Sequence, residues 1–454
     1  MPARGVRTRP ARPGSGTPHG VIARQPHLVT GSRRWLAALQ EARRLDPELR
    51  SLHLAGGSAP SRAPPSGAAI AAMRGRFARA LGVDAETAEQ SHAAAPWKHM
   101  LFRAVLEQWS DPDAALPEWL AAGAPMGLTK AIALGGHLPQ QTVLPALRVT
   151  ELEPMWDEDI NHPSLRKTFG DDAGAAGVAL VQKSVDDGFG EIFADRAAAE
   201  AALGGTVFPA PLGTVSKPKP DGSWKHRLIQ DLRANEVNAA VALPERLVLP
   251  RPLDHALDLA ELSAGRGSGE SMAIGIVDFA DAFMSVPLAP TARRFNCAEL
   301  PEGLRRGRPA LHAEEPEQGQ LIVWRVLGFG GRPNPLVFGR VTAALMRAAQ
   351  ALLTTRGDFE QSSEGKGRQE ECAAPFAAAV TRLHLYVDDA VAAFRGRLDD
   401  ITEAFDLLLL LWLALGAPVA WPKVSLEALG GETPSRWIWG RLRLVQRRRE
   451  DAIA

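Results

Sequence analysis

A short strand that ends in two adjacent carboxylates stands at the centre of the hydrophobic pattern of this chain. Apolar and polar residues alternate over residues 383–387, which is the period of a strand with one buried face. Asp388 and Asp389 interrupt the alternation, and the apolar residues after them predict the returning strand of a hairpin. A nearly continuous apolar run over residues 272–277 predicts a strand buried on both faces, and it ends at a third carboxylate, Asp278.

A second hairpin is predicted upstream of these strands. Residues 212–217 and 227–232 have strand character, and a turn rich in Pro and Gly separates them. The hairpin carries a cluster of basic side chains around its tip: Lys217, Lys219, Lys225, His226 and Arg227. Cationic side chains on a projecting hairpin suit a triphosphate, because they neutralise several phosphate oxygens. A basic turn exposed to solvent fits the same pattern equally well.

Helical periodicity predicts that residues 35–204 are mostly helical, and it gives this region no recognisable role. The first helix places apolar side chains on one face, namely Trp35, Leu36, Leu39 and Ala42. In the second half, a helix is expected to begin with Asn334 as its N-cap and Pro335 at its first position. Gly416 is expected to end another helix that starts near residue 401.

Composition and charge change this picture mainly at the N-terminus. Residues 1–34 contain seven arginines, no lysine and no acidic residue, which predicts a disordered basic arm. The same composition fits an arm that binds nucleic acid or an organelle transit peptide. The whole chain of 454 residues has a formal net charge of +0, so no global basic field marks a nucleic-acid partner.

Cysteine usage and apolar runs bear on the compartment. Two cysteines provide neither a disulfide framework nor a metal-ligand spacing, which fits a reducing, intracellular compartment such as the cytoplasm or the nucleus. The longest apolar run, residues 407–415, is too short to span a bilayer, so no membrane partner is expected.

The three carboxylates are the candidate chemistry. Two like charges at a tight turn repel, so one would be protonated unless a cation lies between them. Mg²⁺ is a natural choice, because it binds carboxylate oxygens together with substrate phosphates. A solvated turn at Asp388 and Asp389 and an N-cap at Asp278 are the structural alternatives.

Taken in order, these stretches resemble the reverse transcriptases of retroelements and retroviruses. Residues 227–235 resemble the fingers strand that grips the nucleotide, and residues 277–288 resemble the motif that carries the first catalytic aspartate. Residues 327–338 resemble the segment before the long palm helix, and residues 386–389 resemble the signature hairpin. Lys423 and residues 437–440 resemble the next two motifs of the family. The resemblance implies an α+β fold with a right-hand palm and fingers, the palm being a ferredoxin-like sheet backed by helices.

The resemblance also implies a division of the chain. Residues 205–445 would form the reverse transcriptase-like domain, preceded by the helical region 35–204 and the basic arm 1–34. Residues 446–454 would be a tail. Neither a thumb nor an RNase H domain is recognisable after the primer grip, which predicts a weak hold on the template-primer, because duplex affinity rests largely on phosphate contacts.

The implied activity is RNA-directed DNA polymerisation, with an RNA template, a DNA primer and dNTPs as partners. Asp278 and Asp388 would hold two Mg²⁺ ions, or Mn²⁺ in their place, with Asp389 assisting and the Phe279 carbonyl as a further ligand. The other implied site residues are Arg227 and either Lys217 or Lys219 at the triphosphate, Phe283 as a steric gate that selects deoxynucleotides, Phe329 and Gly330 under the nucleotide, Lys423 as a further nucleotide-binding residue, and Trp437, Trp439 and Gly440 in the primer grip.

Two features depart from the family pattern. Gly328 stands where a proline is usual, and Trp224 and Arg227 are separated by two more residues than in the commonest pattern, so Lys217 and Lys219 cannot be told apart. A catalytically silent remnant that keeps the fold and binds nucleic acid is an alternative, which the missing thumb favours and the intact carboxylates disfavour. An RNA-dependent RNA polymerase is another, although Phe283 disfavours it.

Overall fold

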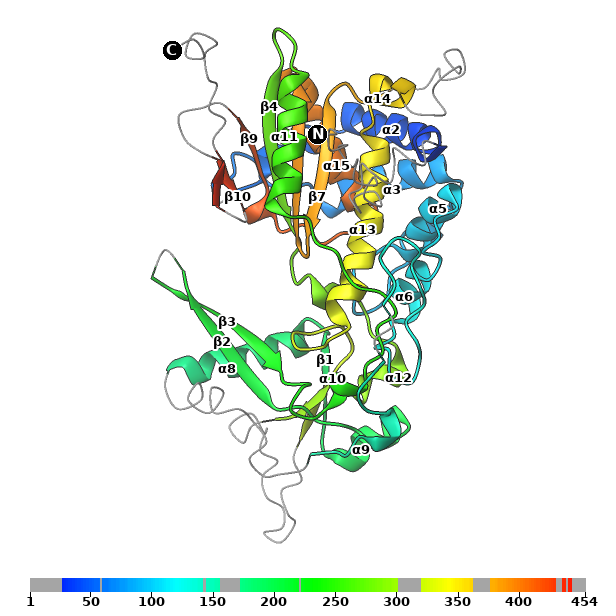
Figure 1. Ribbon diagram of the computed structural model, residues 1–454, viewed down its shortest axis with the longest axis vertical. Coiled ribbons are helices and arrows are strands. Elements are labelled where there is room, and N and C mark those ends of the chain that lie inside the picture. The colour runs from blue at the N-terminus through cyan, green and yellow to red at the C-terminus, as the bar shows by residue number, and fades with distance from the viewer. Residues whose placement is uncertain are drawn as a thin grey trace, which may run out of the picture.

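The computed structural model describes residues 27–57, 59–141, 144–155, 172–219, 222–300, 320–361, 376–429, 435–437 and 440–442. Helix α13 (Asn334–Leu352) runs between an upper lobe built on a four-stranded sheet and a lower lobe that carries a projecting hairpin (Figure 1). The fold mixes helices with antiparallel sheets, in agreement with the expected α+β class.

The four-stranded sheet has the order β7 (Val380–Tyr386), β8 (Asp389–Gly396), β4 (Ser271–Asp278) and β9 (Ser425–Ala428), and all neighbours are antiparallel. The strands expected from residues 272–277, 383–387 and 390–394 are therefore confirmed. Helix α11 (Pro252–Ala264) covers one face of this sheet, and α13 and α15 (Leu398–Ala414) cover the other.

The prediction that residues 383–387 form a strand with only one buried face is wrong, because helix α11 covers the other face as well. His384 on β7 is only 2% exposed, because α11 covers its side of the sheet and Asp258 accepts a hydrogen bond from its ring at 2.5 Å. On the opposite face, a Cβ on Gly275 would lie 2.6 Å from the Phe405 ring of α15, so glycine allows this helix to pack closely on β4.

The lower lobe contains a three-stranded sheet in the order β1 (Gly190–Phe193), β6 (Leu321–Trp324) and β5 (Cys297–Glu299). The predicted second hairpin is confirmed as β2 (Leu212–Pro218) and β3 (Trp224–Gln230), paired in antiparallel register. Helix α8 (Asp172–Asp186) packs against this hairpin, with Val181 buried between Leu212 and Leu228.

The N-terminal helices pack directly on α13 and α15, so one apolar core runs through both regions. The helices α2 (His27–Leu45), α3 (Gly67–Leu81) and α5 (His99–Trp109) form this layer, which Figure 1 shows in blue and cyan beside α13. The remaining helices are short: α4 (Ala85–Ala88), α6 (Leu116–Ala122), α9 (Arg196–Leu203), α10 (Val237–Ala240), α12 (Pro290–Arg293), α14 (Arg356–Gln361), and the 3₁₀ turns η1 (Pro47–Leu49), η2 (Leu52–Ala55), η3 (Val149–Glu151), η4 (Phe283–Ser285) and η6 (Trp421–Lys423).

Two of the expected domain boundaries need correction. Helix α2 begins at His27, so the last residues of the expected disordered arm 1–34 are helical, and Arg33 is 1% exposed. The boundary at residue 204 does not separate two domains either, because β1 pairs with β6 across it. Local composition does not reveal either feature, since both depend on tertiary packing.

Two smaller predictions are also wrong. Asn334 is not the N-cap of α13: Pro333 holds that position, and the Asn334 amide donates a hydrogen bond to the Gly328 carbonyl at 2.6 Å. The single strand expected from residue 437 onward is instead divided into β10 (Ser435–Trp437) and β11 (Gly440–Leu442), which pair in antiparallel register.

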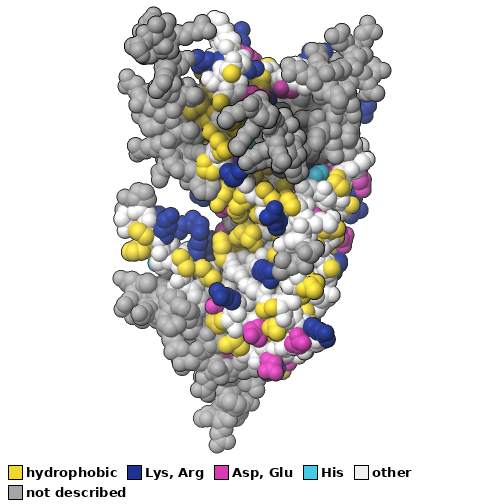
Figure 2. All heavy atoms as spheres, viewed as in Figure 1, with side chains coloured by type: hydrophobic (Ala, Val, Ile, Leu, Met, Phe, Trp, Pro, Cys, Tyr) yellow, Lys and Arg dark blue, Asp and Glu magenta, His cyan; other side chains and the backbone are white. Residues whose placement is uncertain are grey.

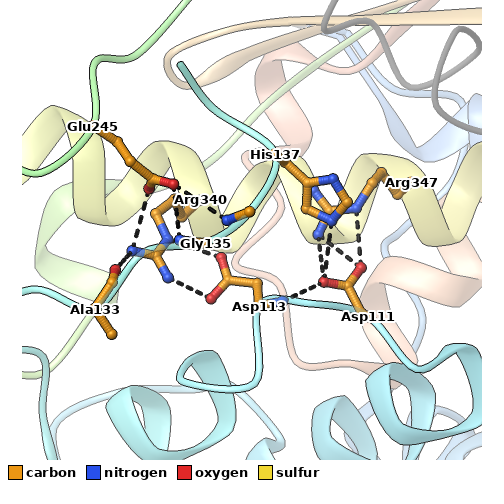
Figure 3. A network of polar contacts seen from close by, with 9 residues as sticks. Asp111, Asp113, Ala133, Gly135, His137, Glu245, Arg340 and Arg347 are labelled. Atoms are coloured by element: carbon orange, nitrogen blue, oxygen red, sulfur yellow. Dashed lines mark hydrogen bonds and ion pairs between the residues drawn. The ribbon is translucent and has the colours of Figure 1, made fainter. Parts of the chain in front are cut away.

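Buried ion pairs attach α13 to the loop that follows α5. Figure 3 shows Arg340 and Arg347 reaching from α13 toward Asp113 and Asp111. Arg347 donates to Asp111 at 2.9 Å, and Arg340 donates to Asp113 at 2.8 Å. All four side chains are nearly inaccessible to solvent, so each charge has its partner inside the protein.

Candidate active site

The register of the four-stranded sheet brings the predicted carboxylates together. Asp278 at the end of β4 lies directly opposite Asp389 at the start of β8, and Asp389 also pairs with Tyr386 at the end of β7. Only Val387 and Asp388 lie in the turn between β7 and β8. Val387 adopts a left-handed conformation with φ of 60°, which is a rare and strained state for a β-branched residue.

The Asp278 carboxylate is buried and only half satisfied. The residue is 6% exposed, and its Oδ1 has no hydrogen-bond partner. Its Oδ2 forms an ion pair with the Nζ of Lys423, which arrives on η6. The Asp278 carbonyl accepts a hydrogen bond from Ala420 at 2.8 Å, so the end of β4 is held next to the segment that carries Lys423.

Mutual repulsion and burial raise the pKa of the other two carboxyls. Burial raises the pKa of Asp388, and the nearby charge of Asp278 raises it further. Burial, followed by the charges of Asp388 and Asp278, raises the pKa of Asp389 to about 6. Electrostatic coupling of this kind requires carboxylates that lie close to one another.

A cavity of about 340 Å³ opens beside these carboxylates. Asp278 and Asp388 belong to its wall, and strand β3 contributes Lys225 and Arg227. Burial lowers the pKa of Lys225, and the charges of Arg227 and Lys423 lower it further. Figure 2 shows the Lys and Arg side chains gathered over the β2–β3 hairpin, next to the hollow between the lobes. Acidic and basic groups therefore meet at this cavity.

Aromatic rings form another part of the cavity wall. The Phe283 ring packs edge-on against Phe329 and Phe338, with centroid distances of 5.5 Å to each. The Arg227 guanidinium lies 5.5 Å from the centroid of the Phe329 ring. Phe283 is thus held by two neighbouring rings at the cavity, and a cation from the hairpin lies over one of them.

The cavity gathers half of the site residues expected from the sequence. Its wall includes Asp278, Phe279, Asp388, Arg227, Phe283, Phe329 and Lys423. Asp389 is not part of this wall, but it lies opposite Asp278 in the β4–β8 register. Phe279, whose carbonyl was the expected further metal ligand, forms an isolated β-bridge with Val419. The hydrogen bonds of this bridge use the Asp278 carbonyl and the Ala280 N–H, and not the Phe279 carbonyl.

Other expected residues lie elsewhere. Lys217 and Lys219 are exposed on the hairpin and do not line the cavity. Gly330 has a φ of 123°, and a Cβ there would lie 1.8 Å from the Gln230 carbonyl oxygen, so glycine is needed for backbone packing. Trp437 and Gly440 pair in the β10–β11 hairpin, and Trp439 lies outside the described residues.

The structure adds residues that the family resemblance did not assign to the site. Lys225, which the sequence analysis named only as one of the basic residues of the hairpin, lies two positions before Arg227 on β3 and lines the cavity with it, as strand periodicity predicts. Lys183, Ser184 and Asp187, from α8 and the residue after it, also line the cavity. No local pattern predicts their role, because they reach the cavity only through the packing of α8 on the hairpin.

The donor set at the carboxylates is suited to a hard divalent cation. It consists of carboxylate oxygens, and the buried Asp278 Oδ1 without a partner is an available ligand atom. Across the described ranges, however, no group of three or more His, Cys, Asp or Glu side chains is already arranged as a metal site. The ammonium of Lys423 instead neutralises Asp278, as a cation bound there would.

No protein-family model matches the sequence, and no curated protein matches it. Solved structures similar to this chain include the foamy viral protease-reverse transcriptase in complex with double-stranded DNA. That match has 16% identity and a TM-score of 0.34, and it covers 63% of this chain and 34% of that chain. The Prototype Foamy Virus protease-reverse transcriptase, in a selenomethionine-labelled mutant form, matches at 15% identity and a TM-score of 0.35, covering 63% of this chain and 28% of that one.

The chain therefore spans between about a quarter and a half of the length of these solved structures. They belong to the family that the sequence motifs resemble. At TM-scores below 0.5 the likeness gives no detail of the site, and the functional conclusion rests on the chain's own residues. Within the described part of the chain, no helix has the length and apolar character needed to cross a membrane.

Proposed function

We propose that this chain is an RNA-directed DNA polymerase that transfers nucleotides from dNTPs to the 3′-hydroxyl of a primer on an RNA template. One observation carries the proposal: the β4–β8 register places Asp278 opposite Asp389, next to Asp388, at a cavity that also exposes cationic side chains of β3. In this assignment the four-stranded sheet is the palm, and the lobe with the β2–β3 hairpin is the fingers.

The carboxylates would hold the catalytic ions. Asp278 and Asp388 would supply oxygen ligands to Mg²⁺, with Asp389 next to them. Divalent ions bound there would lower the pKa of the primer hydroxyl and stabilise the pyrophosphate leaving group. The raised pKa values of Asp388 and Asp389 support this role, because a bound cation would remove the repulsion that now disfavours their charged forms.

The basic side chains of β3 would bind the triphosphate. Lys225 and Arg227 line the cavity with Asp278 and Asp388, so phosphates bound near the carboxylates would lie within reach of both cations. Lys423 neutralises Asp278, and its side chain is still 53% exposed. It is therefore able to turn toward a phosphate when the carboxylate gains another partner.

Phe283 supports the choice of deoxynucleotides. Two neighbouring rings fix its position at the cavity wall, so its bulk cannot easily move aside. A ring next to the sugar would exclude a ribose 2′-hydroxyl by steric overlap, which favours DNA synthesis over RNA synthesis.

Primer extension tests the proposal directly. The full chain is expected to extend an oligo(dT) primer on poly(rA) with dTTP and Mg²⁺, and Asp388→Asn is expected to abolish extension. Phe283→Ala should increase the use of ribonucleotides, whereas Phe283→Tyr, which keeps the ring, should not. Unchanged extension in Asp388→Asn would refute the proposed site, and a wild-type preference for rNTPs would favour the RNA polymerase alternative.

A protein that binds nucleic acid without catalysis is the second candidate function. The ion pair of Lys423 with Asp278 favours it, because a lysine already occupies one oxygen of the carboxylate that a metal would need. The tip of the hairpin also presents Trp224, which is 57% exposed, beside basic residues, as single-stranded nucleic acid binding requires. Salt-dependent binding to an RNA/DNA hybrid without nucleotide incorporation would select this candidate.

A further inference from the structure

Helix α8 brings charged residues to the cavity from a region to which the sequence interpretation gave no role. Val181 of α8 is 1% exposed and packs with Leu212 and Leu228, one from each strand of the hairpin. This contact fixes the helix on the hairpin. Lys183 and Ser184 follow Val181 along α8, and both lie in the cavity wall together with Asp278 and Asp388.

Lys183 also connects the hairpin lobe to the turn that follows β4. Its Nζ forms ion pairs with Asp187, one helical turn away, and with Asp281 at 3.8 Å. Asp281 lies three residues after Asp278 in a left-handed conformation, with φ of 47°. The Lys183 side chain is 56% exposed, so it can change its partner without unpacking the helix.

We propose that Lys183 binds the triphosphate of the incoming nucleotide and is released from Asp281 when it does so. This inference rests on the proposed polymerase function and assigns to it a residue outside the β2–β3 hairpin. A 3.8 Å ion pair at an exposed site is weak, so exchanging Asp281 for a phosphate costs little. A phosphate oxygen is a stronger partner, because it accepts a short charge-assisted hydrogen bond.

The charges around the cavity support this assignment. Burial, followed by the charges of Arg227 and Lys423, lowers the pKa of Lys225, whereas the hydrogen bond to Asp187 raises the pKa of Lys183. Lys183 adds a cation from α8 to those of β3 at the same cavity, so a triphosphate bound there would lie within reach of cations from two elements.

Equilibrium binding of dTTP provides the test. The full chain is bound to poly(rA) and an oligo(dT) primer that ends in a dideoxynucleotide, with Mg²⁺ present, so that binding is measured without chemistry. Lys183→Ala is expected to raise the Kd of dTTP about tenfold, the effect of one charge-assisted phosphate contact, and Lys183→Arg should restore most of the affinity. Lys130→Ala, which removes an exposed lysine that does not line the cavity, is the matched control.

A second variant separates direct contact from an indirect effect through Asp281. Asn tolerates the left-handed conformation, so Asp281→Asn removes the ion pair with little disturbance. If Lys183 contacts the nucleotide, Lys183→Ala still raises the Kd about tenfold in the Asp281→Asn background. If Asp281→Asn alone reproduces the effect of Lys183→Ala, and the double variant binds no more weakly, the inference is refuted.

The readouts distinguish this inference from the proposed function. A wild-type chain that binds dTTP through Lys183 but does not extend a normal primer would refute the polymerase activity and leave the Lys183 site in place. A chain that extends the primer with equal dTTP affinity in wild type and Lys183→Ala would refute only the role of Lys183.

Discussion

Val387 shows at the scale of one residue how tightly the carboxylate turn is built. A β-branched side chain at φ of 60° is unfavourable, and only two residues separate the paired Tyr386 and Asp389. We expect Val387→Asn to raise the free energy of unfolding by about 1 kcal/mol, because asparagine tolerates this conformation. Denaturant unfolding measures the change, with Val387→Ala as the control that removes the branch but keeps a Cβ at positive φ.

Two neighbouring histidines between α11 and the sheet provide a prediction about pH. The ring centroids of His255 on α11 and His384 on β7 lie 3.9 Å apart with the rings tilted, and Asp254 and Asp258 are the acidic groups near them. Burial, followed by the charge of His384, lowers the pKa of His255 to about 3. In the unfolded chain this imidazole titrates near pH 6.5.

The sign of the effect follows from these two pKa values. Between about pH 6.5 and pH 3 the unfolded chain binds a proton at His255 that the folded chain does not. The contribution of His255 to stability is therefore fully present above pH 6.5 and is lost as the pH falls below that value. Thermal unfolding from pH 4.5 to 7.5 should show a smaller acid-induced drop in Tm for His255→Gln than for the wild type. An equal drop in both proteins would show that other groups cause the acid sensitivity.

At the scale of elements, buried arginines from the N-terminal helices satisfy the C-terminal carbonyls of α13 and α15. Arg33 of α2 donates to the Ala351 and Leu352 carbonyls at 2.5 and 3.2 Å. Arg74 of α3 donates to the Leu413 and Ala414 carbonyls at 3.1 and 3.0 Å. A cation at a helix C-terminus stabilises both the free carbonyls and the helix dipole.

Removing one of these contacts should be costly. We expect Arg33→Ala to lower the free energy of unfolding by about 3 kcal/mol, because buried carbonyls at the end of α13 lose a charged donor. Arg44→Ala, an exposed arginine on the same helix, should change it by less than about 0.5 kcal/mol. Guanidinium unfolding of both variants checks the difference, and equal values would contradict a capping role for Arg33.

The sequence predictions are confirmed where local patterns decide the structure, and they fail where contacts between distant parts of the chain decide it. The strands at residues 272–277 and 383–387 were predictable, because their patterns are local. The burial of His384 was not predictable, since it depends on α11, and neither was the position of Lys183, which depends on the packing of α8. The three aspartates could be named as a candidate site, but only the strand register shows that Asp278 lies opposite Asp389.

At the scale of the whole molecule, the N-terminal helices are part of the fold that supports the carboxylates. They share one apolar core with α13 and α15, and ion pairs reinforce the contact, among them Arg347 with Asp111. A chain shortened to begin at residue 67 would lose α2, with the buried Trp35 and Arg33. We therefore expect it to lose cooperative unfolding, since α13 and α15 would each expose an apolar face.

A chain that begins at residue 27 is the matched control, because it keeps all of α2. It should retain a single cooperative transition with the Tm of the full chain, measured by circular dichroism during heating. Cooperative unfolding of the chain that begins at residue 67, at an unchanged Tm, would show that α2 is dispensable for the fold. In that case the shared core would not depend on the contacts of Trp35 and Arg33.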